Sequence, residues 1–489
     1  MTLPEKFAGR ILSELGAEEG TALCAALDTG PSVSVRLNPA KCTAAAEPGP
    51  VQGGPGGTPG GYGSPQGRSG TGAPALLPVL QHADGRVPWC ADGYYLAVRP
   101  QFTFDSDFHA GAYYVQEAAS QFVGHLLGGT ETAGKRILDL CAAPGGKTTL
   151  YASLAGPDGL VVANEIDRRR AQVLADNVRK WGTGNVAVTT CEPRQLGDFE
   201  AWFDVAAVDA PCSGEGMFRK DVQARAEWGE GNVKLCAARQ DGILREAWRA
   251  LKPGGTLIYS TCTFNRDEDE GSLERMLAWA GDEVAETEAV AVDGAWGIVC
   301  GRVGSFRTYR FYPHRARGEG FFAAVARKAY DAGGRCRTPR ARRTVFAQVD
   351  KISAAELRRW VRTPERMCFA AVGDTCYGYY VAQAEAVKQL AEALPVIYAG
   401  VAMGQLFKGS LRPDPALAFF CGLNREAVPA AELDEEQALC YLRRQEVAAG
   451  MFAEGMNLVC ARGRALGFAK RIGNRVNNMY PNTLRIIKQ

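Results

Sequence analysis

The stretch KRILDLCAAPGGKTTL, residues 135–150, decides the fold of this chain. It opens with a short apolar run at 137–140, turns through Pro144-Gly145-Gly146 and continues in residues that favour a helix. This order predicts a strand, a glycine turn and a helix start, the opening of an α/β nucleotide-binding unit. The glycines let a ligand approach the backbone, and the helix start offers unpaired N–H groups.

Two common ligands of such turns fit this one poorly. A phosphate loop requires G-x-x-x-x-G-K-[ST], and Gly146-Lys147-Thr148 supply only its second half, with Cys141 where the first glycine is needed. The turn also departs from the G-x-G-x-x-G pattern of dinucleotide-binding proteins. The pattern therefore favours an adenosyl ligand without an extended phosphate chain.

Composition narrows the class of protein. A chain of 489 residues divides into two to four domains, and 46% hydrophobic and 22% charged residues are ordinary for a globular protein. No run approaches the roughly 18 apolar residues of a membrane span, and no signal peptide is recognisable, so we expect a cytoplasmic protein without a membrane partner. The 15 scattered cysteines form no C-x-x-C pair, which argues against a disulfide framework and against a metal site.

The distribution of charge says more than the net charge of +2. Segments 302–343 and 462–488 gather arginine and lysine among aromatic residues and asparagine, with few acids between them. Solvated surface is the simpler interpretation of any single basic residue. Two such segments in a nearly neutral chain favour a face that binds nucleic acid.

From residue 135 the pattern alternates between strands and helices. Strands are predicted at 137–140, 160–164, 186–190, 204–208, 256–260, 306–311 and 321–327, and the clearest helices at 168–181 and 232–251. Such alternation predicts a parallel sheet that binds ligands beyond the carboxyl ends of its strands. Polar residues follow these ends at the 141–147 turn, Glu165, Glu192, Asp209 and Thr261-Cys262, so we expect one composite site.

The flanks are organised differently. Residues 1–108 contain two predicted helices, an alternating strand at 32–37, and short strands at 87–89 and 94–98. Residues 49–74 are rich in Gly, Pro and Ser and cannot bury enough apolar surface to order themselves, which predicts a flexible insertion.

A catalytic domain is predicted at 109–330, followed by a basic linker at 331–344. Residues 345–489 then form one or two small α+β domains. Their predicted elements are a helix at 351–361, strands at 367–372, 377–381 and 394–403, and a helix at 432–444.

The strand ends carry residues suited to chemistry. Glu165 is placed to accept hydrogen bonds from a ribose diol; a helix N-cap is the alternative, and Asp167 fits that role better. Cys212 and Cys262 follow strands predicted to lie about 4.8 Å apart, so the thiols should be close. A lone cysteine at a strand end is usually a buried hydrophobe, but two beside an acid favour a reactive site, with Lys147 placed to lower a thiol pKa.

Four motifs carry a family resemblance: DLCAAPGGKT (139–148), NEID (164–167), DAPCSGEGMFRKD (209–221) and YSTCTFNRDEDE (259–270). Together they resemble the Sun-type RNA cytosine-5 methyltransferases. SVRLNP (34–39) and the tail LGFAKRIGNRVNNMYPNTLRI (466–486) are similar to the bacterial RsmF type, which acts on small-subunit ribosomal RNA. The resemblance implies a Rossmann-like S-adenosylmethionine domain, an N-terminal RNA-binding part and a C-terminal PUA-like RNA-binding extension.

The resemblance also implies roles for single residues. Cys262 is the nucleophile that adds to carbon 6 of cytosine, Asp209 binds ring nitrogen 3 with help from Lys147, and Cys212 assists release of the product. DNA cytosine methyltransferases place the nucleophile in a Pro-Cys motif instead, so the assignment of Cys262 depends on the resemblance. Residues implied to bind S-adenosylmethionine are Cys141, Ala142, Ala143, Pro144, Gly145, Gly146, Lys147, Glu165, Arg170, Glu192 and Asp209.

Two features depart from the family pattern. Glu192 stands where the family commonly has aspartate, and the insertion at 49–74 is atypical. The expected partner is ribosomal RNA or the small subunit, ahead of transfer RNA, with the protein acting as a monomer and without a metal. The alternatives are a non-catalytic ribosome-assembly factor and a phosphate-loop NTPase.

Overall fold

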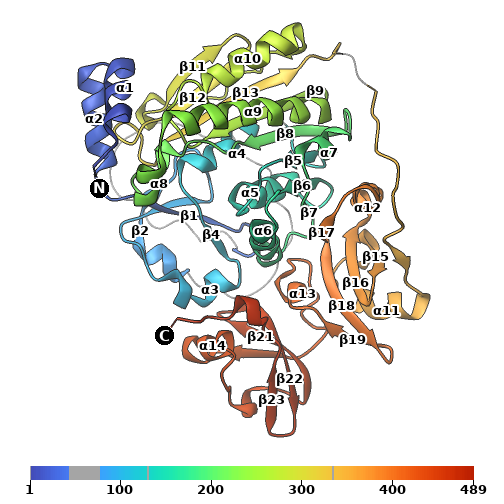
Figure 1. The fold of residues 1–489 in the computed structure, drawn as a ribbon. Coiled ribbons are helices and arrows are strands. Elements are labelled where there is room, and N and C mark those ends of the chain that lie inside the picture. Colours follow the sequence, from blue (N-terminus) through green and yellow to red (C-terminus); the bar gives the residue numbers. More distant parts are fainter. Residues whose placement is uncertain (1, 43–76, 129–130, 333–334, 489) are drawn as a thin grey trace.

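The computed structural model describes residues 2–42, 77–128, 131–332 and 335–488 (Figure 1). Its largest sheet has the order β11-β12-β13-β9-β8-β5-β6-β7-β17, with β10 paired to β13. Five neighbouring strands are parallel: β5 (Arg136–Asp139), β6 (Leu160–Asn164), β7 (Val186–Thr189), β8 (Phe203–Asp209) and β9 (Leu251–Thr261). The predicted α/β fold with a central parallel sheet is confirmed.

Both faces of this sheet are covered, because successive residues of a strand point to opposite sides. Ile137 packs in one buried cluster and Leu138 in the other. One face receives α4 (Phe122–Leu127), α5 (Gly146–Ala155) and α6 (Arg168–Trp181); the other receives α7 (Pro193–Gly197), α9 (Glu230–Ala250) and α10 (Glu270–Ala280). Asp167 caps α6 by accepting hydrogen bonds from the N–H groups of Arg169 and Arg170, as predicted.

Antiparallel strands extend the sheet beyond β9. These are β10 (Val284–Ala285), β11 (Val299–Val303), β12 (Phe306–Phe311) and β13 (Phe321–Lys328). The strands predicted at 306–311 and 321–327 are therefore present, and β13 pairs directly with β9.

The N-terminal part forms a small sheet of order β2-β3-β1-β4. Its strands are β1 (Val33–Leu37), β2 (Ala83–Arg86), β3 (Gly93–Leu96) and β4 (Tyr113–Val115), and α3 (Ser106–His109) precedes β4. Helices α1 (Glu5–Leu15) and α2 (Ala17–Leu27) lie beside α8 (Val222–Glu227), where Phe7 contacts Phe218 and Trp228. The strand predicted at 87–89 is wrong, since β2 ends at Arg86, and the 49–74 insertion lies outside the described residues.

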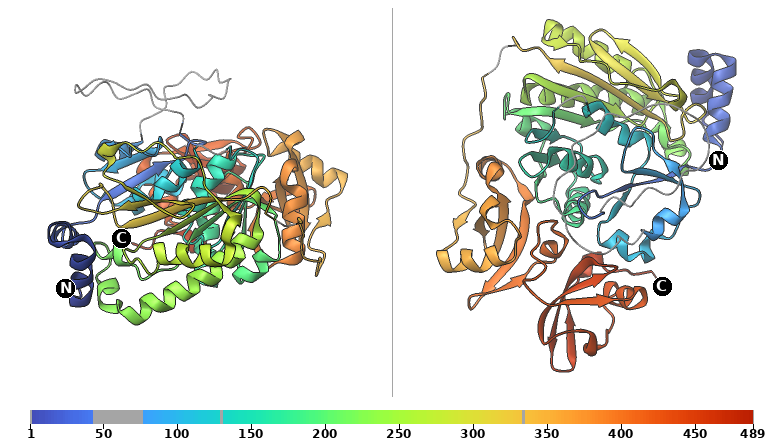
Figure 2. Two further views of the ribbon diagram at one scale, coloured as in Figure 1. Left: turned by 90° about the horizontal axis from the view of Figure 1, so that it is seen from above. Right: turned by 180° about the vertical axis from the view of Figure 1, so that it is seen from behind.

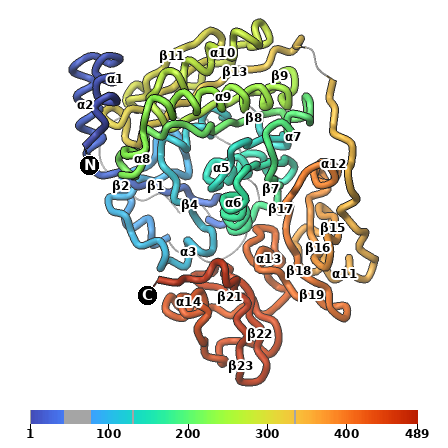
Figure 3. Tube along the Cα trace, viewed as in Figure 1, coloured from blue at the N-terminus to red at the C-terminus, as the bar shows by residue number. Residues whose placement is uncertain are grey.

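Two more sheets follow the catalytic sheet (Figure 3). The first has the order β14 (Ala347–Gln348), β15 (Met367–Val372), β16 (Thr375–Tyr380), β18 (Val401–Phe407) and β19 (Ser410–Pro413), with helices α11 (Lys351–Arg359), α12 (Ala384–Ala393) and α13 (Pro415–Phe419) around it. The second comprises β20 (Ala430–Leu433), β21 (Gly455–Ala461), β22 (Arg464–Ile472) and β23 (Arg475–Asn478), with α14 (Glu435–Leu442). The predicted 432–444 helix begins later, at Glu435, because Asp434 caps it.

The strand predicted at 394–403 is two strands in different sheets. β17 (Val396–Ala399) pairs antiparallel with β7 at the edge of the catalytic sheet, whereas β18 joins the following sheet. Gly400 separates them with φ 63°, and a side chain there would meet the Gly378 carbonyl oxygen at 2.4 Å. Figure 2 shows the result. The sheet of β14, β15, β16, β18 and β19 lies beside the catalytic sheet rather than over either face.

No helix within the described ranges is both long and apolar enough to cross a membrane.

Because α12 packs against the core of the catalytic sheet, truncating one of its buried side chains should destabilise the protein. Leu390 is fully buried in the cluster that includes Ala187 of β7 and Trp202. Leu390→Ala should lower the free energy of unfolding by about 2–5 kcal/mol in urea denaturation, because it removes methyl groups and leaves a cavity. The control is Leu12→Ala, because the Leu12 side chain is 40% exposed. This variant should change the free energy of unfolding by about 0.5 kcal/mol or less. Equal losses of stability in the two variants would show that α12 does not share a core with the catalytic sheet.

Candidate active site

The turn at 141–147 joins β5 to α5. Side chains from outside the turn hold its carbonyl groups, and we call the side of the turn that they contact its outer side. Arg170 Nη2 donates to the Ala143 carbonyl at 3.0 Å, and Asn177 Nδ2 donates to the Pro144 carbonyl at 2.8 Å. Gly145 has φ 111°, in the region that favours glycine. The first turn of α5 leaves backbone N–H groups without partners in the helix, so the inner side of the turn can bind a polar ligand.

Glu165 lies buried at the carboxyl end of β6, where its carboxylate is fixed by two contacts. One oxygen accepts the Asp167 N–H at 3.0 Å, and the other forms an ion pair with Arg170 Nη1 at 3.1 Å. Arg170 therefore bridges Glu165 and the Ala143 carbonyl, which brings three of the predicted cofactor residues together.

Asn164 is a residue that the sequence analysis missed. Its amide donates to the Cys191 carbonyl at 3.0 Å, and its oxygen accepts from the Thr189 hydroxyl at 2.9 Å and the Cys191 N–H at 3.1 Å. These bonds fix the end of β7 next to the end of β6. Glu192 follows directly as the exposed N-cap of α7, and its backbone N–H donates to Gln195 Oε1 at 3.3 Å.

The two predicted thiols are in contact. The Sγ atoms of Cys212 and Cys262 are 3.3 Å apart, and the Cys262 N–H points to Cys212 Sγ at 3.4 Å. The hydrogen bond with Cys262, followed by burial, raises the pKa of Cys212 well above its ordinary value, and the charges of Cys262 and Glu268 act in the same direction. Cys212 thus holds its proton more firmly than an exposed thiol does.

Lys147 and Asp209 form an ion pair beside these thiols. Lys147 Nζ lies 2.8 Å from Asp209 Oδ2, and the Ser260 hydroxyl donates to Oδ1 at 2.7 Å. Burial alone would lower the pKa of Lys147, but the charge of Asp209 and the hydrogen bond with it outweigh burial and raise that pKa. The lysine is therefore a cation, and its charge also interacts with Cys262.

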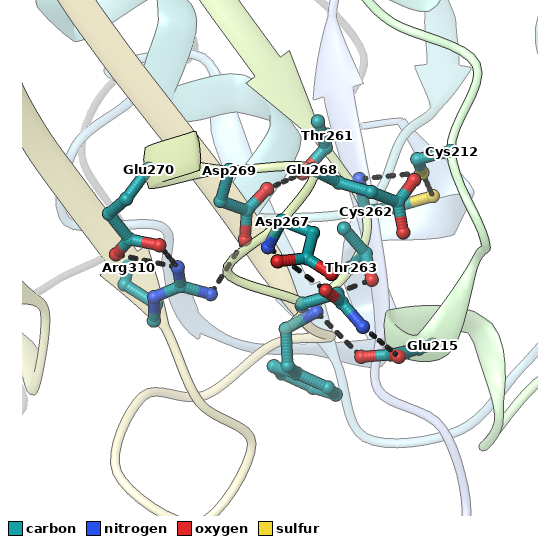
Figure 4. Close-up of polar contacts among 12 residues, drawn as sticks. Cys212, Glu215, Thr261, Cys262, Thr263, Asp267, Glu268, Asp269, Glu270 and Arg310 are labelled. Atoms are coloured by element: carbon teal, nitrogen blue, oxygen red, sulfur yellow. Dashed lines mark hydrogen bonds and ion pairs between the residues drawn. The ribbon is translucent and has the colours of Figure 1, made fainter. Parts of the chain in front are cut away.

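A buried carboxylate holds the loop that carries Cys212 (Figure 4). Glu268 Oε2 accepts the Ser213 N–H at 2.9 Å and Gln240 Nε2 at 3.0 Å. The Ser213 hydroxyl is also bonded to Thr263 Oγ1 at 2.9 Å. The loop after β8 is in this way tied to the segment after β9, which keeps the two thiols in contact.

Two further acidic groups brace the same segment. Glu215 is fully buried and accepts from Arg10 Nη2 at 2.7 Å and from the Phe264 N–H at 3.2 Å. Asp269 accepts from the Thr261 hydroxyl at 2.6 Å and pairs with Arg310 at 2.7 Å (Figure 4). The acids of the DEDE run at 267–270 were visible in the sequence, but the burial of Glu268 and Asp269 was not.

The site suits an adenosyl ligand. Three turn carbonyls, those of Ala143, Pro144 and Gly146, accept side-chain donors from the outer side, while the N–H groups at the start of α5 remain for a ligand. Glu165 presents a carboxylate at the position where α/β sheets hold a ribose. No group of three or more His, Cys, Asp or Glu in the described part of the chain is arranged to hold a metal ion.

Three family models match separate parts of the chain. The model described as 16S rRNA methyltransferase RsmB/F matches residues 130–327, the N-terminal domain of 16S rRNA methyltransferase RsmF matches 73–118, and the methyltransferase RsmF PUA domain matches 428–486. Two curated relatives are both called ribosomal RNA small subunit methyltransferase F. The protein from Erwinia tasmaniensis is 31% identical over 84% of this chain and 86% of its own, and that from Shewanella loihica 30% over 81% and 83%.

Solved structures have the same fold. NSun6 from Pyrococcus horikoshii with SFG is 20% identical with a TM-score of 0.52, covering 67% of this chain and 99% of its own. A methyltransferase homolog protein from the same organism is 24% identical with a TM-score of 0.51, covering 66% and 95%. The fold is that of an S-adenosylmethionine-dependent methyltransferase. At the identities above, the chain belongs to the RsmF family of ribosomal RNA small subunit methyltransferases.

A substitution at Gly216 tests how tightly the loops that carry Cys212 and Cys262 pack against each other. Its N–H donates to the Cys262 carbonyl at 2.9 Å, and a Cβ atom would meet the backbone oxygen of Gly320 at 2.4 Å and that of Cys262 at 2.9 Å. Gly216→Ala should lower the free energy of unfolding by about 1–3 kcal/mol, because the backbone at Gly320 and at Cys262 must move.

The control is Gly242→Ala within α9, where nothing lies within 4 Å of the added atom. This change should raise the free energy of unfolding by about 0.5–1 kcal/mol, since alanine favours a helix. Urea denaturation of both variants measures the difference. A neutral Gly216→Ala would show that the loops yield easily.

Proposed function

We propose that the protein transfers a methyl group from S-adenosylmethionine to carbon 5 of cytosine in small-subunit ribosomal RNA. The observation that carries this proposal is the pair of touching thiols, with Cys212 and Cys262 Sγ atoms 3.3 Å apart, beside the Lys147–Asp209 ion pair. Family membership supports ribosomal RNA as the substrate class. A structural scaffold would need neither the paired thiols nor the buried cation next to them.

The reaction needs a nucleophile because carbon 5 of cytosine is unreactive in the intact ring. In the proposed mechanism the Cys262 thiolate adds to carbon 6, which makes carbon 5 electron-rich. Asp209 shares a proton with ring nitrogen 3, which neutralises the negative charge that develops there, and Lys147 pairs with the carboxylate that remains. When bound, S-adenosylmethionine supplies the methyl group as an electrophile.

The roles of the thiols follow the family resemblance, which makes Cys262 the nucleophile. The hydrogen bond with Cys262 and burial raise the pKa of Cys212, so that Cys212 holds its proton more firmly than an exposed thiol does. After methylation the carbon 5 proton passes to solvent, the bond between carbon 6 and Cys262 breaks with its electron pair going to the sulfur, and the aromatic ring is restored. We assign to Cys212, next to the departing sulfur, the assistance of this last step.

The contacts of the turn support the proposed cofactor residues. Residues 141–147 offer backbone N–H groups, Glu165 binds the ribose, and Arg170 holds both in place. Glu192, exposed at the end of β7, is assigned to the adenine amino group, with Asp209 between the two ligands. We also propose that residues 1–108 and 345–489 contact RNA on either side of the catalytic domain at 109–330.

The predicted basic face requires revision, since six of the twelve Arg and Lys residues in the first basic segment, 302–343, form ion pairs within the chain. Pairs with acids involve Arg302, Arg307, Arg310, Arg315, Arg317 and Arg337. A better surface is a groove of about 650 Å³ that includes Arg99, Lys180 and Lys488 together with Phe102, Phe108 and Tyr114. None of the described residues that line it is acidic, and the exposed Arg99 and Lys488 beside aromatic faces suit single-stranded RNA.

The deciding experiment measures methyl transfer from labelled S-adenosylmethionine to small-subunit RNA and to small subunits. Wild type should methylate carbon 5, Cys262→Ala should be inactive, and Cys212→Ala should accumulate a covalent protein–RNA adduct. The opposite pattern would place the nucleophile at Cys212. If wild type methylates neither substrate, transfer RNA is the next substrate to assay, and inactivity on all of them would favour a non-catalytic assembly factor.

The groove makes a separate prediction about RNA affinity. Arg99→Glu should weaken RNA binding several-fold and reduce the slope of log affinity against log salt by about one, because a phosphate contact is lost. Lys388→Glu, an exposed change on α12 away from the groove, is the matched control and should leave both quantities unchanged. Filter binding at several salt concentrations measures them. Equal loss in both variants would show that only the total charge matters.

A further inference from the structure

Arg36 is a fully buried arginine that reaches from the N-terminal sheet to the cofactor turn. It lies on β1 and is 1% exposed. Its Nη2 atom donates to the Gly146 carbonyl at 3.0 Å and to the Thr149 hydroxyl at 2.7 Å, and Nε donates to Gln116 Oε1 at 2.7 Å. The guanidinium stacks on Trp181 at 4.5 Å from the ring centre.

This charge has no acidic partner in contact with it. Among the described residues no carboxylate forms an ion pair with Arg36, and Asp92 acts only from a greater distance. Burial lowers the pKa of Arg36 to about 10, which still leaves it charged at neutral pH. A buried charge without a counterion destabilises a fold, so a strand needed only for packing would carry an apolar residue here.

The bonds of Arg36 brace the first turn of α5. Gly146 is the first residue of this helix, so the helix sets the direction of the Gly146–Lys147 peptide, and Arg36 holds that turn through the Gly146 carbonyl and the Thr149 hydroxyl. Asn177 and Tyr114 act in the same way on the Pro144 carbonyl and thereby direct the Gly145 N–H. The peptides that precede Gly145 and Lys147 are thus both held by side chains from outside the turn.

The position of the charge adds to this effect. The N-terminus of α5 is already positive because of its helix dipole, and the guanidinium adds a full charge behind it. An anionic group bound at the inner side of the turn would balance that excess. In S-adenosylmethionine the anionic group is the carboxylate of the methionine portion.

We propose that Arg36 is a positioning residue for the carboxylate of the cofactor, supplied by the N-terminal part of the chain. It fixes the Gly146–Lys147 peptide and provides the positive charge that the carboxylate balances. The N-terminal part therefore completes the cofactor site, in addition to the RNA contacts proposed for it.

The test compares two ligands that differ in the carboxylate. S-adenosylhomocysteine carries the amino-acid portion, whereas 5′-methylthioadenosine has the same adenosyl thioether without it. Arg36→Met keeps much of the volume and should weaken S-adenosylhomocysteine about tenfold in calorimetric titration, while 5′-methylthioadenosine changes by less than about twofold. Arg36→Lys keeps the charge but not the several donors of the guanidinium, so its affinity for S-adenosylhomocysteine should lie between those of wild type and Arg36→Met. If Arg36→Met does not fold, Arg36→Lys is used for the comparison instead.

The matched control is Arg136→Met. Arg136 also stacks on a tryptophan, 4.3 Å from the Trp202 ring centre, but it begins β5 at the end remote from the turn. This variant should bind both ligands as wild type does. Equal weakening of both ligands by Arg36→Met, or no weakening of either, would overturn the proposal. RNA is absent from the titration, so the result does not depend on which base is methylated.

Discussion

The parallel pairing of β8 with β9 is the constraint on which the active site depends. In this register Asp209 lies opposite Ser260, which is the last paired position of the two strands. There the Ser260 hydroxyl donates a hydrogen bond to the Asp209 carboxylate. The chain leaves both strands at the same edge, so the next loops carry Cys212 and Cys262 into contact. A shift by one residue would turn Asp209 to the other face of the sheet and separate it from Lys147.

Much of this arrangement could be predicted from the sequence. The alternating apolar runs located all five parallel strands, and strand ends of a parallel sheet must meet at one edge, which was enough to bring Cys212 near Cys262. The position of Glu165 after β6 followed from the same argument. Local pattern and one general rule of topology sufficed for these features.

Other features depend on partners far away in the sequence and could not be predicted. Glu268 and Arg36 look like ordinary surface charges in the sequence, and only tertiary packing buries them against Ser213 and Gly146. Arg315 looked free to bind RNA, but its partner Glu19 comes from an N-terminal helix. Likewise, periodicity identifies a strand near residue 396 without indicating which sheet it joins.

These distant contacts share one physical consequence. β17 adds a strand to the catalytic sheet from one flank, and Arg36 reaches the cofactor turn from the other. An unpaired β7 edge would expose backbone donors and acceptors, and a turn without Arg36 would lose an outer support. The flanking parts are therefore structural components of the catalytic unit.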